Sequence, residues 1–160
     1  MTRYFVGIGS NENAVHNCTA MIRAIRSAFR QVCVSSIVQT PDYGVTAPGV
    51  AAPDVAAPHY LNAVVSFEAS LSIPELYGWC KNLESQLGRT RNQNGVCQAD
   101  LDILQPGNVS EEFFQPLVLQ LQAFLKGEDS GVGLEKVSLQ LDEQMIVGDA
   151  PCYLFQAEPV

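Results

Sequence analysis

The sequence comprises 160 residues, of which 47% are hydrophobic and 16% are charged, with a formal net charge of −8. A chain of this size can bury a core of its own, so we expect one domain spanning residues 1–160. Residues 92–160 contain eleven acidic side chains and only two basic ones, Lys126 and Lys136. Because an acidic surface repels phosphate backbones, this composition argues against nucleic acid as a partner.

The apolar segments and the cysteines bear on the compartment. No apolar stretch is long enough to span a bilayer, and the first residues lack the pattern of a signal peptide. The five cysteines are widely spaced and form no Cys-x-x-Cys pair, which is typical of free thiols in a reducing environment. We therefore expect a cytoplasmic protein with no membrane partner, and the oligomeric state stays open.

The first third of the chain predicts a strand, a helix and a second strand. Residues 3–11 read as a short buried strand that runs into two turn-forming glycines. The following helix is expected to bury one face and to expose its arginines. The expected buried face contains Val15, Ile22, Ile25 and Phe29, and the expected outer side contains Arg23, Arg26 and Arg30. Residues 32–40 are rich in β-branched side chains and predict one strand, which is followed by a long Pro/Ala-rich surface loop.

The middle of the chain adds a strand, a helix and a further strand. Residues 60–70 alternate between apolar and polar side chains, which predicts a half-buried strand. Ser72 and Glu75 have the spacing of a capping box, so a helix is expected to start there and to end near Gly88. Residues 97–104 predict the next strand. The order β-α-β-β-α-β is that of an α+β, ferredoxin-like sandwich, to which a helix near 113–125 and a hairpin within 136–158 are added.

Asp100 and Asp102 are the most informative polar residues of the chain. They are two positions apart in a predicted strand, so their side chains point to the same face. Two ionised carboxylates side by side repel each other, and a hard divalent cation such as Mg²⁺ relieves that repulsion. The alternative is a solvated edge strand whose outer face is acidic. Taken alone, the pair does not decide between the two.

Several linked motifs extend this observation. They are GIGSN at 7–11, QTPDYG at 39–44, PHYLNAVVSFEASLSIPEL at 58–76, KNLESQLGRTR at 81–91 and ADLDIL at 99–104. In this order and spacing, the chain resembles the 6-hydroxymethyl-7,8-dihydropterin pyrophosphokinase family over roughly residues 4–105. The resemblance implies an enzyme that moves diphosphate from ATP to a pterin alcohol in folate biosynthesis, with Mg²⁺ as cofactor and ATP as co-substrate.

The resemblance also implies roles for individual residues. Asp100 and Asp102 match the family's metal-binding and catalytic aspartates, and Arg89 matches a catalytic arginine. The matched nucleotide-binding positions are Glu84, Arg89 and Arg91. The matched pterin-binding positions are Thr40, Pro41, Tyr43, Gly44, Tyr60 and Asn62. Gly9, Ser10 and Asn11 match positions that form a turn and start a helix.

Two segments depart from the family pattern. Residues 94–97 read Asn-Gly-Val-Cys where family members usually have Trp-Gly-Pro-Arg, so an aromatic residue and a basic one are replaced. Residues 105–117 are shorter than in the family and contain no His, Lys or Arg. The cations that would hold a triphosphate are therefore depleted, which implies weak or lost phosphoryl transfer.

Three functions are consistent with these observations. The first is a divergent pterin pyrophosphokinase. The second is a non-catalytic relative that binds a pterin-like molecule as a sensor or carrier. The third is an oligomerisation module in which the alternating C-terminal strands pair with another chain. Nucleotide affinity separates the first two, and the third predicts no small-molecule binding.

Overall fold

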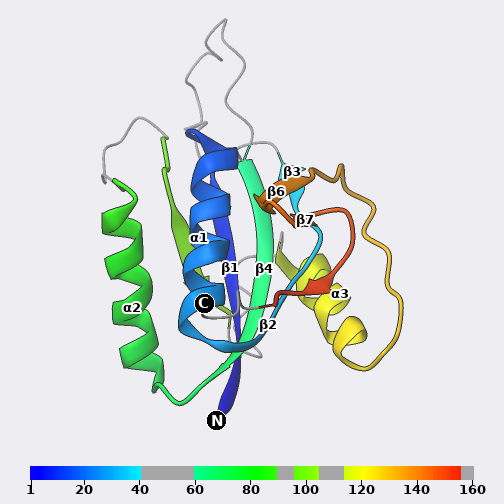
Figure 1. The fold of residues 1–160 in the computed structure, drawn as a ribbon, viewed down its shortest axis with the longest axis horizontal. Helices are drawn as coiled ribbons and strands as arrows, with labels where there is room; N and C mark the ends of the chain where they lie inside the picture. Colours follow the sequence, from blue (N-terminus) through cyan, green and yellow to red (C-terminus); the bar gives the residue numbers. More distant parts are fainter. Residues whose placement is uncertain (41–59, 90–95, 105–113, 156–160) are drawn as a thin grey trace, which may run out of the picture.

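The computed structural model describes residues 1–40, 60–89, 96–104 and 114–155, and the architecture below refers to these residues. The elements in chain order are β1 (Thr2–Ser10), α1 (Ala14–Ala28), β2 (Arg30–Val34), β3 (Val38–Thr40), β4 (Tyr60–Ala69), α2 (Ile73–Gln86), β5 (Asp100–Ile103), α3 (Gln115–Leu125), β6 (Leu139–Asp142), β7 (Met145–Val147) and β8 (Cys152–Tyr153). Figure 1 shows their arrangement.

The main sheet has six strands in the order β5-β1-β4-β2-β8, and β3 also pairs with β4. Every pairing between these strands is antiparallel. With β5 at one edge and β1 and β4 in the centre, this is the strand order of a ferredoxin-like sandwich. The α+β, ferredoxin-like prediction is confirmed.

Both long helices cover the same face of the sheet (Figure 1). Alternate residues of the central strands, such as Val6, Ile8 and Val65, point to this face and are fully buried. Met21 and Ile22 of α1 and Leu76 of α2 close the core from above. Removing this apolar surface from water is the main force that holds the helices on the sheet.

Helix α2 begins and ends where the sequence predicts. The Ser72 side chain accepts a hydrogen bond from the Glu75 backbone N–H, and the Glu75 carboxylate accepts one from the Ser72 N–H, which completes the capping box. At the other end Gly88 has φ of +87°, a left-handed conformation that glycine adopts without strain. Both helix-end predictions are confirmed.

The second face of the sheet is covered by α3, which forms a smaller core. Phe114, Leu117 and Leu121 are buried there against Val38 and Val64. Because β4 is covered on both sides, the prediction that residues 60–70 form a half-buried strand is wrong. Ser66, which the alternation places outside, is fully buried.

The single strand predicted for residues 32–40 is also wrong, because it is interrupted between β2 and β3. The Ser35 hydroxyl donates to the Ser36 carbonyl and accepts from the Val64 N–H. The Gln120 amide of α3 binds both the N–H and the hydroxyl of Ser36. These buried hydrogen bonds satisfy the polar groups at the break and attach α3 to it.

Helix α1 is correctly predicted in position, but three of the residues that the sequence assigns to it lie in environments other than those predicted. Val15 is 57% exposed instead of buried, whereas Arg26 is only 8% exposed instead of lying outside. Its guanidinium reaches Asp142 of β6 at 2.7 Å, so the C-terminal hairpin buries it. Arg30 belongs to β2 and not to the outer side of the helix.

The C-terminal segment is a hairpin only in part. Strands β6 and β7 pair with each other as predicted, but β8 leaves them and pairs with β2 at the edge of the main sheet. Helix α3 occupies its expected place. Among the described helices none combines the length and apolarity required to cross a membrane.

Candidate active site

The two aspartates of β5 lie opposite two glycines of β1. In the antiparallel register Asp100 pairs with Gly9 and Asp102 pairs with Gly7. Residues that face each other in such a pair share one side of the sheet. The two carboxylates therefore lie on the side opposite α1 and α2, where β1 contributes no side chains beside them.

The two glycines are required by close neighbours on the same side. A Cβ atom at Gly9 would lie 2.7 Å from Asn62 Oδ1, and one at Gly7 would lie 2.6 Å from the Phe114 ring. The Asn62 amide thus extends over Gly9 towards β5, and the first residue of the α3 region closes over Gly7. A floor of glycine backbone lies between the aspartates and β4.

Three residues that the sequence predicts to bind a pterin, Thr40, Tyr60 and Asn62, lie on this same side of the sheet. Asn62 pairs with Gly9 across β1–β4, and Tyr60 of β4 pairs with Thr40 of β3. The Asn62 Nδ2 donates a hydrogen bond of 2.5 Å to Thr40 Oγ1, and both residues are buried. The bond orients the amide with its Oδ1 towards Gly9. Pro41, Tyr43, Gly44 and Arg91, which the sequence also singles out, fall outside the described residues.

A row of alternating charges connects α2 to Asp100. Lys81 Nζ lies 3.1 Å from Glu84 Oε1, and Arg89 Nη1 lies 3.1 Å from Glu84 Oε2. The same Arg89 nitrogen lies 2.9 Å from Asp100 Oδ1 and donates to the Ala99 carbonyl at 3.2 Å. Glu84 also accepts the Leu101 backbone N–H at 2.7 Å. We call Lys81, Glu84, Arg89 and Asp100 the charge row.

Burial differs along the charge row. Glu84 is 3% exposed, while the Arg89 and Asp100 side chains are each 28% exposed. Burial alone would lower the pKa of Arg89, but the hydrogen bond to Asp100 and the nearby charges of Glu84 and Asp100 raise it above its usual value. Arg89 is therefore held as a cation between two carboxylates.

The segment before β5 is fastened to the end of β1. The Cys97 N–H donates to Asn11 Oδ1, and the Asn11 N–H donates to the Cys97 carbonyl. The Ser10 hydroxyl reaches the same carbonyl. Ser10 and Asn11 thus act in local structure, but they fasten the segment before β5 and do not start the helix, which begins at Ala14. Burial raises the pKa of the Cys97 thiol despite the opposing charge of Arg89, so the thiol stays neutral near pH 7.

Comparison with known families identifies the family of the chain. Residues 5–125 match the family model of 7,8-dihydro-6-hydroxymethylpterin-pyrophosphokinase. The chain belongs to this family. It is accordingly a pterin pyrophosphokinase, an enzyme of the diphosphotransferase class that acts in folate biosynthesis. No curated protein matches the chain in a direct sequence comparison.

The donor set of this pyrophosphokinase can be compared with what a divalent cation needs. Asp100 and Asp102 offer carboxylate oxygens from one side of β5, and Asp102 Oδ2 is shielded from solvent. No group of three or more His, Cys, Asp or Glu side chains in the described part of the chain could enclose a metal. Two carboxylates without a closed cage fit Mg²⁺, which keeps several waters and takes phosphate oxygens as further ligands.

The cations near the site differ from those that the sequence analysis considered. Lys136 forms a backbone β-bridge with Val38 of β3. From β3 the sheet continues through β4 and β1 to β5, so three strand spacings of about 4.8 Å each separate Val38 from Asp100. Lys126 follows the last turn of α3. Lys81, which sequence reasoning overlooked, belongs to the charge row instead. The i,i+3 spacing of Lys81 and Glu84 on a helix was the available signal.

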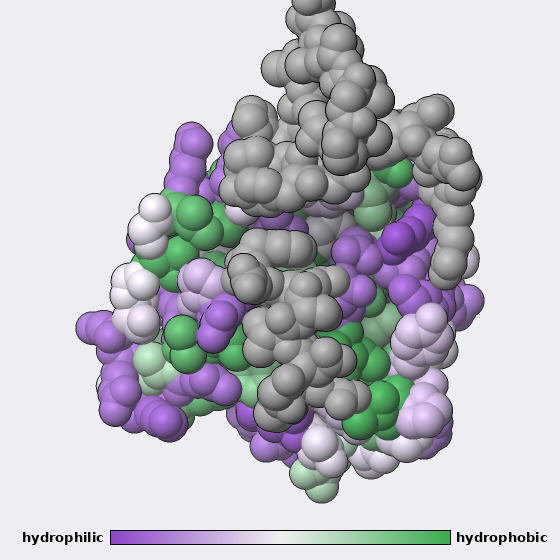
Figure 2. Space-filling model, turned by 180° about the vertical axis from the view of Figure 1, so that it is seen from behind, coloured by the Kyte–Doolittle hydropathy of each residue, from purple (hydrophilic) through white to green (hydrophobic). Residues whose placement is uncertain are grey.

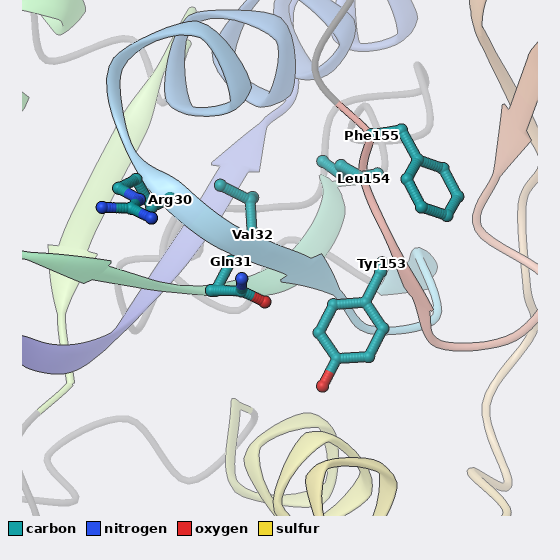
Figure 3. A pocket seen from close by; sticks show the side chains of 6 residues that line it. All are labelled: Arg30, Gln31, Val32, Tyr153, Leu154 and Phe155. Carbon is teal, nitrogen blue, oxygen red and sulfur yellow. The ribbon is translucent and has the colours of Figure 1, made fainter.

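A separate cavity of about 510 Å³ lies at the opposite edge of the sheet. Figure 3 shows the residues that line it, which are Arg30, Gln31, Val32, Tyr153, Leu154 and Phe155. They come from β2 and from β8 with the two residues after it. None of the six is acidic or a thiol, so they offer neither a metal ligand of that kind nor a nucleophilic sulfur. The cavity thus offers no counterpart to the two aspartates of β5.

Proposed function

We propose that the protein transfers diphosphate from ATP to the hydroxymethyl group of 6-hydroxymethyl-7,8-dihydropterin in a Mg²⁺-dependent reaction. The observation that carries this proposal is the shared side of the sheet. Asp100 and Asp102 of β5, Asn62 of β4 and Thr40 of β3 come from three strands, and the register brings them to one side. Family membership gives the reaction class, and this arrangement supports the proposal that the reaction takes place on this side of the sheet.

The pterin would bind against β4 and the end of β3. Tyr60 offers an aromatic ring for stacking, and Asn62 offers an amide whose orientation is already set by Thr40. Pro41, Tyr43 and Gly44 continue directly from Thr40 and are proposed to complete the pterin site. Pre-orientation of the amide lowers the entropic cost of binding.

Asp100 and Asp102 would hold Mg²⁺ at the β5 edge. When bound, the metal would neutralise phosphate charge and orient the diphosphate that is transferred. Arg89 lies next to Asp100 and would neutralise further charge together with Arg91. Phosphoryl transfer depends on positioning and electrostatics more than on covalent chemistry, and these groups would contribute to both.

Glu84 remains predicted as a nucleotide contact, but its described contacts support a different task. Both of its oxygens already accept hydrogen bonds from Lys81, Arg89 or Leu101, and the residue is almost fully buried. We propose that Glu84 is a positioning residue, which acts on the nucleotide through Arg89.

AMP formation tests the proposed function. Purified protein is supplied with ATP, Mg²⁺ and 6-hydroxymethyl-7,8-dihydropterin, and a variant with Asp100→Asn and Asp102→Asn serves as the matched control because it keeps size and hydrogen-bonding capacity. Pterin-dependent AMP that disappears in the variant is the expected result. Equal AMP from both proteins would contradict the metal site.

The replacement of a family arginine by Cys97 favours one second candidate. Because a neutral thiol stands where family members usually have an arginine, one cation fewer is available to a triphosphate. Pterin binding at Tyr60 and Asn62 without AMP formation would then identify a pterin-binding relative that has lost turnover. The two functions are separated by measuring pterin affinity and AMP in the same preparation.

A further inference from the structure

Arg89 Nη1 lies within hydrogen-bond distance of more acceptors than it has hydrogens. Three oxygens surround this one nitrogen: Glu84 Oε2 at 3.1 Å, the Ala99 carbonyl at 3.2 Å and Asp100 Oδ1 at 2.9 Å. A guanidinium Nη atom carries two hydrogens, so two acceptors are enough to satisfy it. One of the three contacts is therefore dispensable for this nitrogen.

The three acceptors differ in how readily they can be given up. Glu84 is almost fully buried and also holds the Leu101 N–H, so its carboxylate is fixed. The Ala99 carbonyl is part of the backbone next to β5. Asp100 is the exchangeable partner, because its side chain is 28% exposed and water can reach it. Removing Asp100 from Arg89 still leaves both Nη1 hydrogens with acceptors.

Electrostatic repulsion between the two aspartates explains why Asp100 would exchange Arg89 for a metal ion. The carboxylates of Asp100 and Asp102 share one side of β5, and without a metal their repulsion is relieved in part by the Arg89 charge. A divalent cation at Asp100 would compete with the guanidinium for the same carboxylate. The two positive groups repel each other at short range, so both cannot hold Asp100 at full strength.

We infer that Arg89 is a placeholder for the metal, which means that its guanidinium holds the Asp100 carboxylate until a divalent cation binds there. Arg89 then keeps its hydrogen bonds to Glu84 and to the Ala99 carbonyl and stays beside the site. This inference rests on the proposed function, because it assumes that Asp100 and Asp102 bind the metal. Glu84 is in this view the positioning residue that keeps Arg89 in place after the exchange. Lys81 balances the other oxygen of that buried carboxylate.

The placeholder predicts that removing Arg89 strengthens metal binding. Mn²⁺ alone is titrated into nucleotide-free protein, and free Mn²⁺ is followed by electron paramagnetic resonance. Because a partly exposed ion pair is weak, Arg89→Gln is expected to bind Mn²⁺ about two- to five-fold more tightly than the natural protein. An unchanged or weaker affinity would overturn the placeholder. Arg89→Met tests the same point if Arg89→Gln does not fold.

Lys81→Gln is the matched control for net charge. It also removes one positive charge from the charge row, but Lys81 contacts Glu84 and not Asp100. The placeholder predicts that Lys81→Gln binds Mn²⁺ no more tightly than the natural protein. An increase as large as that of Arg89→Gln would show a general charge effect and would overturn the inference.

A double-mutant cycle tests the part assigned to Glu84. Glu84→Gln keeps an acceptor for the Leu101 N–H but loses the charge that retains Arg89, so Arg89 is left to Asp100 and Mn²⁺ binding weakens. In the Arg89→Gln background the same change should have a clearly smaller effect. Equal effects in both backgrounds would mean that Glu84 does not act through Arg89.

The same titration separates failure of the placeholder from failure of the proposed function. The Asp100→Asn, Asp102→Asn variant must lose the Mn²⁺ binding that the natural protein shows. If it does not, the proposed metal site falls. If it does, but Arg89→Gln binds Mn²⁺ no more tightly, only the placeholder falls.

Discussion

At the scale of single residues, Gly9 shows that the site depends on an absent side chain. The Asn62 amide occupies the space that a Cβ atom at Gly9 would need, and its other end is held by Thr40. A sequence indicates a glycine as a turn former by default. Here Gly9 lies inside β1, and its role is to admit a neighbour, which becomes visible only when the register with β4 is known.

Gly9→Ala is expected to weaken pterin binding without unfolding the protein. The new methyl group would displace Asn62 Oδ1 and disturb its bond to Thr40, at a cost of about 1–3 kcal/mol, which corresponds to roughly 5- to 150-fold in affinity. Fluorescence titration with the pterin measures the loss.

Gly78→Ala is the matched control for this substitution. Gly78 lies within α2, and a Cβ atom there meets nothing within 4 Å. Alanine should stabilise the helix by about 0.5–1 kcal/mol and leave pterin affinity unchanged. If both variants bind the pterin as the natural protein does, the Asn62 amide has no part in recognition.

At the scale of elements, predictable features are those fixed by neighbouring residues. The capping box at Ser72 and the left-handed Gly88 are local signals, and both ends of α2 follow from them. The break between β2 and β3 is invisible in the sequence because a run of β-branched residues surrounds it. It depends on Gln120, which lies more than eighty residues away.

The same reasoning explains the remaining differences. Alternation in β4 suggests one solvent-facing side, but α3 covers that side with Phe114 and Leu117. Arg26 has the helical position of an exposed residue, and only Asp142 from the C-terminal hairpin buries it. Within the site, the common side of Asp100 and Asp102 could be predicted from spacing. The three acceptors around Arg89 could not, because they come from two segments, α2 and the start of β5.

Gln120→Ala is expected to loosen α3. The substitution removes both hydrogen bonds between Gln120 and Ser36. The Ser36 hydroxyl keeps its bond to the Asp149 carbonyl, but the buried Ser36 N–H is left unsatisfied, which costs about 1–3 kcal/mol. Urea denaturation measures the change in the free energy of unfolding. Gln122→Ala, an exposed position on the same helix, should stay within about 0.5 kcal/mol of the natural protein. Equal stability of both variants would show that the Gln120–Ser36 bonds contribute nothing.

At the scale of the whole molecule, we propose that residues 1–160 form one cooperative domain. The two cores lie on opposite faces of one sheet and share its central strands, so neither can be lost alone. Because the cores share the sheet, unfolding followed by tryptophan fluorescence and by circular dichroism should give coincident transitions. On the described surface seen from behind, hydrophobic and hydrophilic residues are interspersed (Figure 2). Two separate transitions would contradict a single domain.

The buried thiols make stability sensitive to alkaline pH. Burial raises the pKa of Cys18 and Cys80 to about 12 and that of Cys33 to about 11, from a usual value of 9.0. Below pH 9 the thiols are protonated in both states, and their contribution is fully present. Between about pH 9 and 12 the unfolded state ionises first, so stability falls as the pH rises.

Urea midpoints at pH 8 and pH 10 measure this dependence. Cys18→Ala should show a smaller difference between the two pH values than the natural protein, because one buried thiol is missing. Comparing the two proteins cancels the ionisation of tyrosine and lysine, which both share. An identical pH dependence would mean that Cys18 ionises as readily in the folded protein as in the unfolded one.

The contact between Glu84 and Leu101 has a consequence for the behaviour of the protein in concentrated solution. Strand β5 ends the sheet, and an exposed N–H at such an edge invites the strand of another molecule, which is a common route to aggregation. The Glu84 carboxylate occupies the Leu101 N–H and adds negative charge at that position. The carboxylate that we propose positions Arg89 thus also occupies a hydrogen-bond donor at the edge of the sheet, and we expect its loss to affect both the site and the edge.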